Sequence, residues 1–352
     1  MSIYSIWNNK GGVGKSYLTF QVAAEYARIH PEKRVLVVDL CPQANSSSML
    51  LGGMQAGEAN LNQIHFAVPR LTISGYIEER IFSPYVNPRS GARFALPVHR
   101  YNYPIPRNLF LVVGDEQLEI QASRVNAATF PGPQDAWRIV HTWISDLIQD
   151  IATSWNNEDY TVFIDCNPSF SIYTELALSA SDRLIVPFSA DGSSKRAVRA
   201  VLALIYGVTR QPGQQQSEFH TNSQRFRMTQ PTLYMYVGNR LTQYNQASGA
   251  AFKSVVNEIG EEIYAVWQAN ANLFCVHPAG APAPTSKRAF RQMFQYEVND
   301  ANTASVVSGT LGVPISGLTS GRRQVLGKEV MVNQSQLDKQ VPNIRALAAA
   351  IE

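Results

Sequence analysis

The stretch that decides the fold is Lys10–Ser16, which reads KGGVGKS. It follows a short apolar run at residues 3–7, and it precedes a segment in which apolar residues recur every three or four positions from Leu18 to Ala27. A run of strand length, a glycine-rich turn and an amphipathic helix form the context that a phosphate-binding loop requires. The stretch therefore predicts a strand, a loop and a helix, with a nucleoside triphosphate bound at the loop.

Each residue type in this loop suits that chemistry. The glycines allow backbone N–H groups to turn toward phosphate oxygens, and the N-terminus of the following helix adds partial positive charge. We expect Lys15 to contact the β- and γ-phosphates and the Ser16 hydroxyl to ligate Mg²⁺, so the expected cofactors are ATP and Mg²⁺. The expected binding segment is Lys10, Gly11, Gly12, Val13, Gly14, Lys15, Ser16 and Tyr17.

Apolar runs of strand length recur along the chain and alternate with helical patterns, such as the apolar stripe of residues 134–154. The further runs are residues 34–40, 109–113, 161–164, 183–187 and 233–237. Apolar strands that alternate with amphipathic helices predict a three-layer α/β/α fold, in which a mostly parallel, twisted sheet is covered by helices on both faces. Ligands of such sheets bind at the carboxyl ends of the strands.

Two stretches interrupt this alternation. Residues 83–108 are rich in Pro, Arg and aromatic residues and have no clear period, and residues 211–230 are polar and Gln-rich, which is typical of a surface loop. No linker is obvious enough to divide the chain. We therefore expect one nucleotide-binding domain over residues 1–352, with inserted excursions at about 83–108 and 211–230.

The composition limits the class of protein. With 352 residues, 45% of them hydrophobic and 16% charged, the chain has the composition of a globular protein. Its apolar runs are far shorter than the roughly 18 residues that a spanning helix needs, and its first ten residues lack the pattern of an export signal. The three cysteines include no C-x-x-C pair. These features favour the cytoplasm and give no support for a disulfide framework.

Lys10, at the head of the loop, makes KGGVGKS resemble the deviant Walker A motif of the ParA/MinD family of ATPases. In that family the leading lysine reaches across a dimer to the nucleotide of the other subunit. The resemblance therefore implies a homodimer joined by ATP and gives Lys10, Lys15 and Asp39 catalytic roles.

Three further segments extend the resemblance. Residues 39–45 (DLCPQAN) are similar to the family's D-x-D-P-Q-x-N segment, and residues 164–169 (IDCNPS) to its Walker B segment, with Asn167 in place of a proline. They imply that Asp39, Asp165 and Ser16 surround the metal. Asn239 resembles the family position that reads the adenine edge, although an Asn there can equally cap the following helix.

Cys41 stands where most family members have a second acid that orients or activates the attacking water. A thiol is largely protonated at neutral pH and is a weak hydrogen-bond acceptor. Either another group, such as Asp39, positions the water, or ATP is bound durably and hydrolysed very slowly. Our hypothesis is slow hydrolysis with ATP-dependent dimerisation preserved. Cys41 and Cys166 both follow strand ends, where a shared redox or metal role competes with packing as small core residues.

Basic residues gather in parts of the chain although its formal net charge is only +3. Partition-type relatives use a basic surface of the dimer to hold DNA non-specifically, and phosphate contacts of that kind carry no sequence information. The candidates here are Lys195, Arg196, Arg199, Arg322 and Arg323. The alternative is an ordinary solvated face.

The resemblance implies an ATP-dependent dimeric switch that partitions or positions a plasmid, a chromosomal locus or another cargo over the nucleoid, with a ParB-like or other partner protein from an adjacent gene. The alternatives are a nearly non-hydrolysing ATP-bound dimer that acts as a scaffold or regulator, and a metallocluster carrier, which the missing cysteine pairs disfavour. A MinD-like membrane tail is disfavoured because residues 341–352 have the composition of a packing helix, so no membrane partner is expected.

Overall fold

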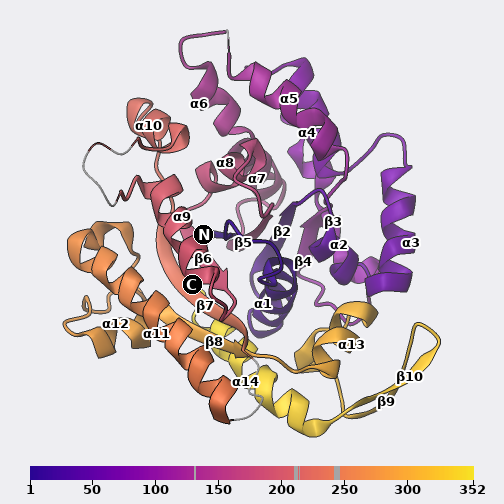
Figure 1. Ribbon diagram of the computed structural model, residues 1–352. Helices are drawn as coiled ribbons and strands as arrows, with labels where there is room; N and C mark the ends of the chain where they lie inside the picture. Colours follow the sequence, from indigo (N-terminus) through magenta and orange to yellow (C-terminus); the bar gives the residue numbers. More distant parts are fainter. Residues whose placement is uncertain (131, 210–212, 214, 242–245) are drawn as a thin grey trace.

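A central sheet organises the chain (Figure 1). The structure, a computed structural model, describes residues 1–130, 132–209, 213, 215–241 and 246–352. Eight strands of these residues lie in the order β3-β4-β2-β5-β1-β6-β7-β8, and neighbours are parallel except for β3, which is antiparallel to β4. The strands are β1 (Ser2–Ile6), β2 (Arg34–Leu40), β3 (Leu96–Pro97), β4 (Leu109–Val112), β5 (Tyr160–Cys166), β6 (Arg183–Phe188), β7 (Thr232–Leu241) and β8 (Gln295–Asn299).

Helices cover both faces of the sheet. One face packs against α1 (Lys15–Ile29), α2 (Asn45–Leu50), α3 (Gly53–His65), α13 (Thr303–Leu311) and α14 (Gln334–Ala349). The other face packs against α4 (Ile73–Phe82), α5 (Leu118–Ala128), α6 (Ala136–His141), α7 (Trp143–Ser154), α8 (Ile172–Ser179), α9 (Ser194–Tyr206), α10 (Glu218–Arg225), α11 (Gln246–Ala269) and α12 (Lys287–Phe294). A separate hairpin of β9 (Gly321–Val325) and β10 (Lys328–Val332) lies outside the central sheet and packs beside α13 (Figure 1).

The alternation of side chains along each strand explains the two cores. In β2, Leu36 and Val38 belong to one hydrophobic core, whereas Val35 and Val37 belong to the other. A strand that is buried on both faces must be apolar at successive positions, which is why these runs are continuous in the sequence. The prediction of a mostly parallel sheet with helices on both faces is confirmed.

The stripe of residues 134–154 forms two helices, α6 and α7, where the periodicity suggested one. They meet at Thr142, whose hydroxyl donates to the carbonyl of Ile139 at 2.8 Å. A threonine hydroxyl that bonds to the preceding turn competes with the regular helical pattern, so one apolar stripe can cover two helices.

The excursion at residues 83–108 packs closely against the body. Phe94 and Val98 are buried, and Leu96–Pro97 adds an edge strand to the sheet. The side-chain amide of Asn102 donates to the carbonyls of Leu50, at 2.9 Å, and Gly312, at 2.7 Å. These bonds tie the excursion to α2 and to the end of α13.

The expectation of a surface loop at residues 211–230 was wrong for part of that stretch. Residues 211, 212 and 214 lie outside the described residues, but Glu218–Arg225 form the helix α10. The hydroxyl of Ser217 accepts a bond from the backbone of His220 and begins the helix, and Phe219 is buried with its ring 5.9 Å from that of Phe170. One well-placed aromatic residue holds a helix whose sequence is otherwise polar.

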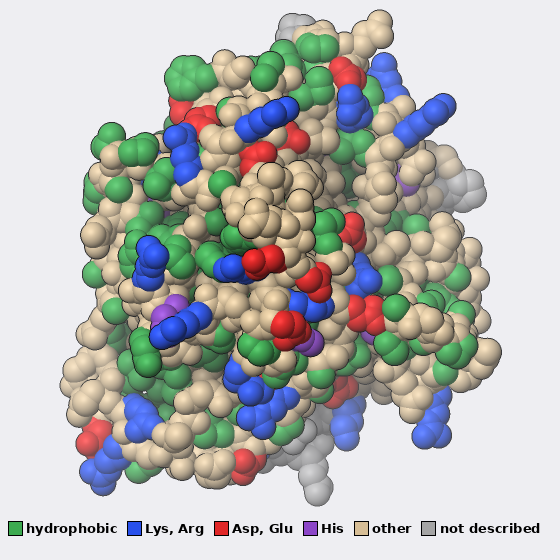
Figure 2. Space-filling model, turned by 180° about the vertical axis from the view of Figure 1, so that it is seen from behind, with side chains coloured by type: hydrophobic (Ala, Val, Ile, Leu, Met, Phe, Trp, Pro, Cys, Tyr) green, Lys and Arg blue, Asp and Glu red, His purple; other side chains and the backbone are tan. Residues whose placement is uncertain are grey.

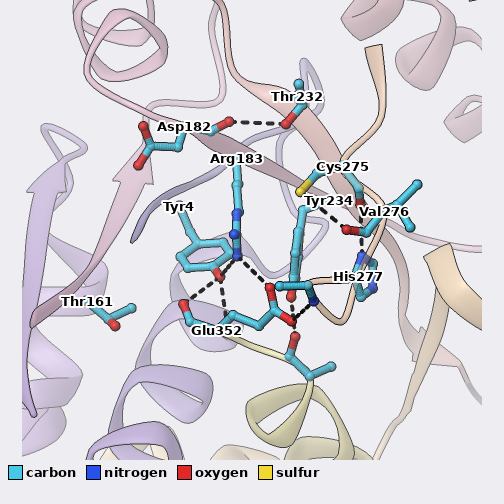
Figure 3. A network of polar contacts seen from close by, with 12 residues as sticks. Tyr4, Thr161, Asp182, Arg183, Thr232, Tyr234, Cys275, Val276, His277 and Glu352 are labelled. Atoms are coloured by element: carbon cyan, nitrogen blue, oxygen red, sulfur yellow. Dashed lines mark hydrogen bonds and ion pairs between the residues drawn. The ribbon is translucent and has the colours of Figure 1, made fainter. Parts of the chain in front are cut away.

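The end of α14 is attached to the sheet by a polar network (Figure 3). Arg183 at the start of β6 donates to the hydroxyl of Tyr4 at 2.6 Å and forms an ion pair with Glu352 at 3.5 Å. Tyr4 in turn donates to the carbonyl of Glu352 at 2.9 Å. Ile344 and Leu347 are buried, as the prediction of a packing helix requires. Among the described residues, no helix has the length and apolar character needed to cross a bilayer.

Candidate nucleotide-binding site

The loop between β1 and α1 has the geometry of a phosphate cradle. Gly12 and Gly14 adopt left-handed backbone angles, with φ of 75° and 80°, which other residues rarely adopt. A Cβ atom placed on Gly11 or Gly12 would meet nothing within 4 Å, so this side of the loop is open. The loop therefore presents backbone to a space that an anion can fill.

A cavity of about 630 Å³ adjoins the loop. Its wall contains residues of the loop and of the carboxyl ends of β2 and β5, together with residues of α2, α3 and α13. These include Gly11, Gly12, Gly14, Lys15, Ser16, Tyr17, Cys41, Glu58, Cys166, Pro168, Val306 and Thr310. The cavity thus joins the predicted loop and strand ends in one site, and it has the size of a small-ligand pocket.

Lys15 lies inside this site. Its ammonium donates to the carbonyls of Lys10, at 2.9 Å, and Asn8, at 3.3 Å, and the residue is buried. Burial lowers its pKa, and the nearby Asp165 opposes that effect. Lys15 is therefore held at the loop by backbone oxygens, which a phosphate oxygen can replace.

Asp39 and Asp165 are directly opposite each other on β2 and β5. Both are fully buried, and burial raises the pKa of Asp39. Its two carboxylate oxygens accept bonds from the backbone of Cys41, at 3.0 Å, and from the backbone and hydroxyl of Ser47, at 3.0 and 2.7 Å. Asp39 thereby shapes the segment that follows β2. Gly114 is needed beside it, because a Cβ there would lie 2.7 Å from the Asp39 carboxyl carbon.

Asp165 differs from Asp39 in its partners. Among the described residues, neither of its carboxylate oxygens has a hydrogen-bond partner, and the buried hydroxyl of Ser46 has none either. Burial, and then the charge of Asp39, raise the pKa of Asp165 to about 7. The hydroxyls of Ser16 and Ser46 lie nearby and oppose this rise. A buried carboxylate that no donor contacts at full hydrogen-bond geometry is unfavourable unless something compensates it, and Mg²⁺ prefers oxygen ligands. The residues present fit a Mg²⁺ ion beside Asp165.

Cys41 lines the cavity as a buried thiol. Burial, followed by the charges of Asp39 and Asp165, raises its pKa to about 12. It therefore carries its proton at neutral pH and cannot accept one from water. Cys166 is also buried, and burial raises its pKa as well.

Asn239 lies at the end of β7, close to the loop. Its side-chain amide donates to the carbonyl of Val13 at 2.9 Å and to that of Gly14 at 3.4 Å, and the residue is fully buried. In this conformation its two hydrogen bonds hold the backbone of the phosphate loop. Its contact with adenine stays a prediction.

Lys10 contacts a part of its own chain that sequence reasoning missed. Its ammonium is bonded to the Asp191 carboxylate and to the hydroxyl of Ser189, at 3.1 Å. Asp191 lies in the turn between β6 and α9. An acid shortly after a strand end is a weak signal, and only the fold brings it to the loop.

The basic candidates do not share one environment. Lys195 and Arg199 of α9 form ion pairs with Glu258, at 2.9 Å, and Glu262, at 2.6 Å, of α11. Arg196 on the same helix is exposed. On the face shown in Figure 2, basic side chains are interspersed with acidic ones and form no single continuous patch.

The two arginines of the hairpin are paired more loosely. Arg322 is 70% exposed and lies 3.1 Å from Glu329 on β10. Arg323 donates to the carbonyl of Thr319 at 3.0 Å. Because β9 belongs to a hairpin outside the main layers, these arginines stand apart from the charges of α9.

Sequence reasoning also missed the cavity wall formed by α3 and α13. Glu58 of α3 accepts a bond from the hydroxyl of Ser48 at 2.6 Å. The close approach depends on Gly57, where a Cβ would lie 2.1 Å from the carbonyl oxygen of Ser48. The Gly52-Gly53 pair followed by Gly57 was the available signal, since closely packed backbones require glycine.

A phosphate loop between the first strand and helix of a mostly parallel sheet, with acids at the ends of adjacent strands, defines the class of P-loop NTPase folds. Residues 1–90 match a family profile described as an AAA domain. The structure of ATP-bound McdA from Cyanothece is similar over 100% of this chain and 98% of that one, with a TM-score of 0.57 and 12% identity. The apo McdA structure gives a TM-score of 0.54, also at 12% identity, over 99% of each chain.

Two curated relatives are similar in sequence. The chromosome partitioning protein ParA of Myxococcus xanthus is 27% identical over 190 residues, which are 54% of this chain and 52% of that protein. A ParA family protein of Mycoplasma genitalium is 23% identical over 206 residues, 58% of this chain and 64% of the relative. The matches thus span about half to two thirds of the relatives' length. Within the P-loop class, the relatives to which this chain is similar in sequence are ParA-family proteins.

Proposed function

We propose that this protein is an ATP-dependent dimeric switch that partitions or positions a cargo. The observation that carries the proposal is the open phosphate loop, headed by Lys10, beside the buried and unpartnered carboxylate of Asp165. The similarity to a chromosome partitioning protein supports a plasmid or chromosomal locus as the cargo.

In this proposal each residue of the site has its own role. The glycines and Lys15 hold the phosphates, and Ser16, Asp39 and Asp165 surround Mg²⁺, Asp39 also shaping the following loop. Mg²⁺ supplies charge neutralisation at the phosphates when it is bound. Val13 and Tyr17 belong to the same segment, and Asn239 fixes the loop and contacts the base. Lys10 reaches the nucleotide of a second copy.

Hydrolysis is proposed to be weak and stimulated by a partner protein. The Cys41 thiol keeps its proton and offers no base for the attacking water. The same observation favours a second candidate function, a nearly non-hydrolysing ATP-bound dimer that acts as a scaffold or regulator. The two candidates differ in turnover and share the dimer.

We propose that the dimer also binds duplex DNA without sequence preference, with Arg322 and Arg323 as its main phosphate contacts. Lys195 and Arg199 are weaker candidates, because each would have to leave a carboxylate of α11. Arg196 is exposed on the same helix. The proposed setting is the cytoplasm, in association with the nucleoid, with a ParB-like or other partner encoded by an adjacent gene and without a membrane partner.

The test measures molecular mass and DNA binding of the full chain with ADP and with ATP. We expect a monomer with ADP, a dimer with ATP, and DNA binding that increases with ATP and weakens with salt. The double variant Arg322→Ala/Arg323→Ala should reduce the slope of log affinity against log salt by about 2. The matched control Lys195→Ala/Arg199→Ala removes two cations that are already paired and should change it less. A monomer with ATP would contradict the dimeric switch, and sequence-specific or salt-independent binding would contradict the DNA proposal.

A further inference from the structure

The ammonium of Lys10 is bound by acceptors of its own chain, on Ser189, Asp191 and Ser194, which we call the seat of this lysine. Two of the three acceptors lie in the turn between β6 and α9, the hydroxyl of Ser189 at 3.1 Å and the carboxylate of Asp191, and the third is the hydroxyl of Ser194, the first residue of α9, at 3.4 Å. The Lys10 side chain is 24% exposed. An ammonium has three donors, so this seat can occupy all of them.

The seat is organised independently of Lys10. Asp191 accepts bonds from the hydroxyl of Ser189, at 2.7 Å, and from the backbone and hydroxyl of Ser193, at 3.0 and 2.8 Å. Partial burial would raise the pKa of Asp191, but the bonds from Lys10 and these serines outweigh it and hold that pKa well below its usual range. Asp191 is therefore charged at every physiological pH, and a cation beside it is stabilised.

A lysine in this seat is not available elsewhere. To reach a nucleotide bound to a second copy, Lys10 must give up the Asp191 carboxylate and both hydroxyls. We propose that Asp191 is a positioning residue for Lys10: it holds the lysine within one chain and thereby raises the ATP concentration at which the dimer forms. This inference rests on the proposed function, in which Lys10 acts across a dimer.

The expected size follows from the exposure of the pair. Partly exposed ion pairs contribute a few tenths to about 1 kcal/mol, which corresponds to about a twofold to fivefold change in an equilibrium constant, with about threefold near the middle of that range. A dimer contains two copies of Lys10, and both must leave their seats. The two changes multiply, so removal of the seat should strengthen dimerisation about tenfold.

The experiment compares the wild type with Asp191→Asn by sedimentation at a series of ATP concentrations. We expect the variant to reach half dimerisation at a lower ATP concentration, with a dimer dissociation constant about tenfold smaller. Ser189→Ala removes one acceptor without a change of charge and should shift dimerisation in the same direction by a smaller amount. ADP binding by the monomer should be the same in all three proteins, since the proposed contact of Lys10 is with the nucleotide of a second copy.

Asp135→Asn is the matched control. It makes the same change of charge and breaks an ion pair, with Arg138 on α6, that does not line the cavity. If Asp191→Asn and Ser189→Ala dimerise like the wild type, the seat is overturned while the proposed dimer stands. If neither they nor the wild type dimerise with ATP, both fail. If Asp191→Asn loses ADP binding through misfolding, Ser189→Ala decides the question alone.

Discussion

Replacing Asp165 by Asn should stabilise the nucleotide-free protein even though it removes a proposed metal ligand. The carboxyl group has a pKa of about 7 in the folded chain, against an ordinary value of 3.8, because it is buried beside Asp39. The folded state therefore holds the proton more tightly than the unfolded state does. The Asp165 carboxyl therefore does not lower the free energy of unfolding below pH 3.8, but it lowers that free energy progressively as the pH rises from 3.8 to 7.

The magnitude follows from linkage. Between pH 5 and pH 7 each pH unit is worth roughly 1 kcal/mol or slightly more, so the loss over this range is about 2 to 3 kcal/mol. Asp39 and Asp165 titrate as a pair, so this change in the free energy of unfolding belongs to the ionisation of the second of the two carboxyl groups. Asp165→Asn should therefore raise the free energy of unfolding relative to wild type by about 2 to 3 kcal/mol more at pH 8 than at pH 5.

Urea unfolding of both proteins at the two pH values, without Mg²⁺ or nucleotide, measures this difference of differences. Effects of the new amide that do not depend on pH cancel. Asp338→Asn, at an exposed position on α14, serves as the control and should show no such pH dependence. Mg²⁺ with ATP should reverse the order, stabilising the wild type and not the variant. An equal gain or loss of stability at pH 5 and pH 8 would refute the electrostatic reasoning.

Two further predictions concern Cys41 and Asp115. Cys41→Asp places a carboxylate where the buried thiol keeps its proton, and it should raise the steady-state ATPase rate about tenfold or more while leaving ATP-dependent dimerisation in place. No gain of rate would count against slow hydrolysis caused by Cys41. Asp115→Asn should lower the free energy of unfolding by about 2 kcal/mol at pH 7, since burial of this carboxyl is outweighed by bonds from Arg70, Ser74 and Thr72 that lower its pKa to about 2. That stabilisation is present above pH 3.8 and disappears as pH falls to 2, so unfolding curves of the two proteins should converge there.

The sequence predicted the loop and the central strands because their signals are local. A phosphate loop needs glycines and a lysine at fixed spacing, and a strand buried on both faces must be apolar throughout. Elements with few buried residues gave no such signal. In β8 only Val298 is buried, and in β9 only Val325, so neither strand shows a period.

The partners of the predicted charges could not be read from the sequence. Lys10 and Asp191 are 181 positions apart, and only the pairing of β1 with β6 brings their loops together. The pairing of Lys195 with Glu258 likewise depends on the packing of α9 against α11. Motifs indicate which groups bind a ligand, whereas the fold determines what holds those groups before the ligand arrives.

In the nucleotide-free structure, different contacts hold the groups proposed to bind Mg²⁺-ATP and the lysine proposed to act across the dimer. Lys15 and Asp165 are buried, and each can exchange its present environment for Mg²⁺-ATP within one chain. Lys10 is partly exposed, and it is held by a carboxylate of its own chain. Under the proposed function, binding of nucleotide therefore need not release Lys10, and a monomer loaded with ATP is expected as a distinct state. We expect the buried Asp39–Asp165 pair to govern how readily that state forms, and Asp191 to govern how readily two such monomers associate.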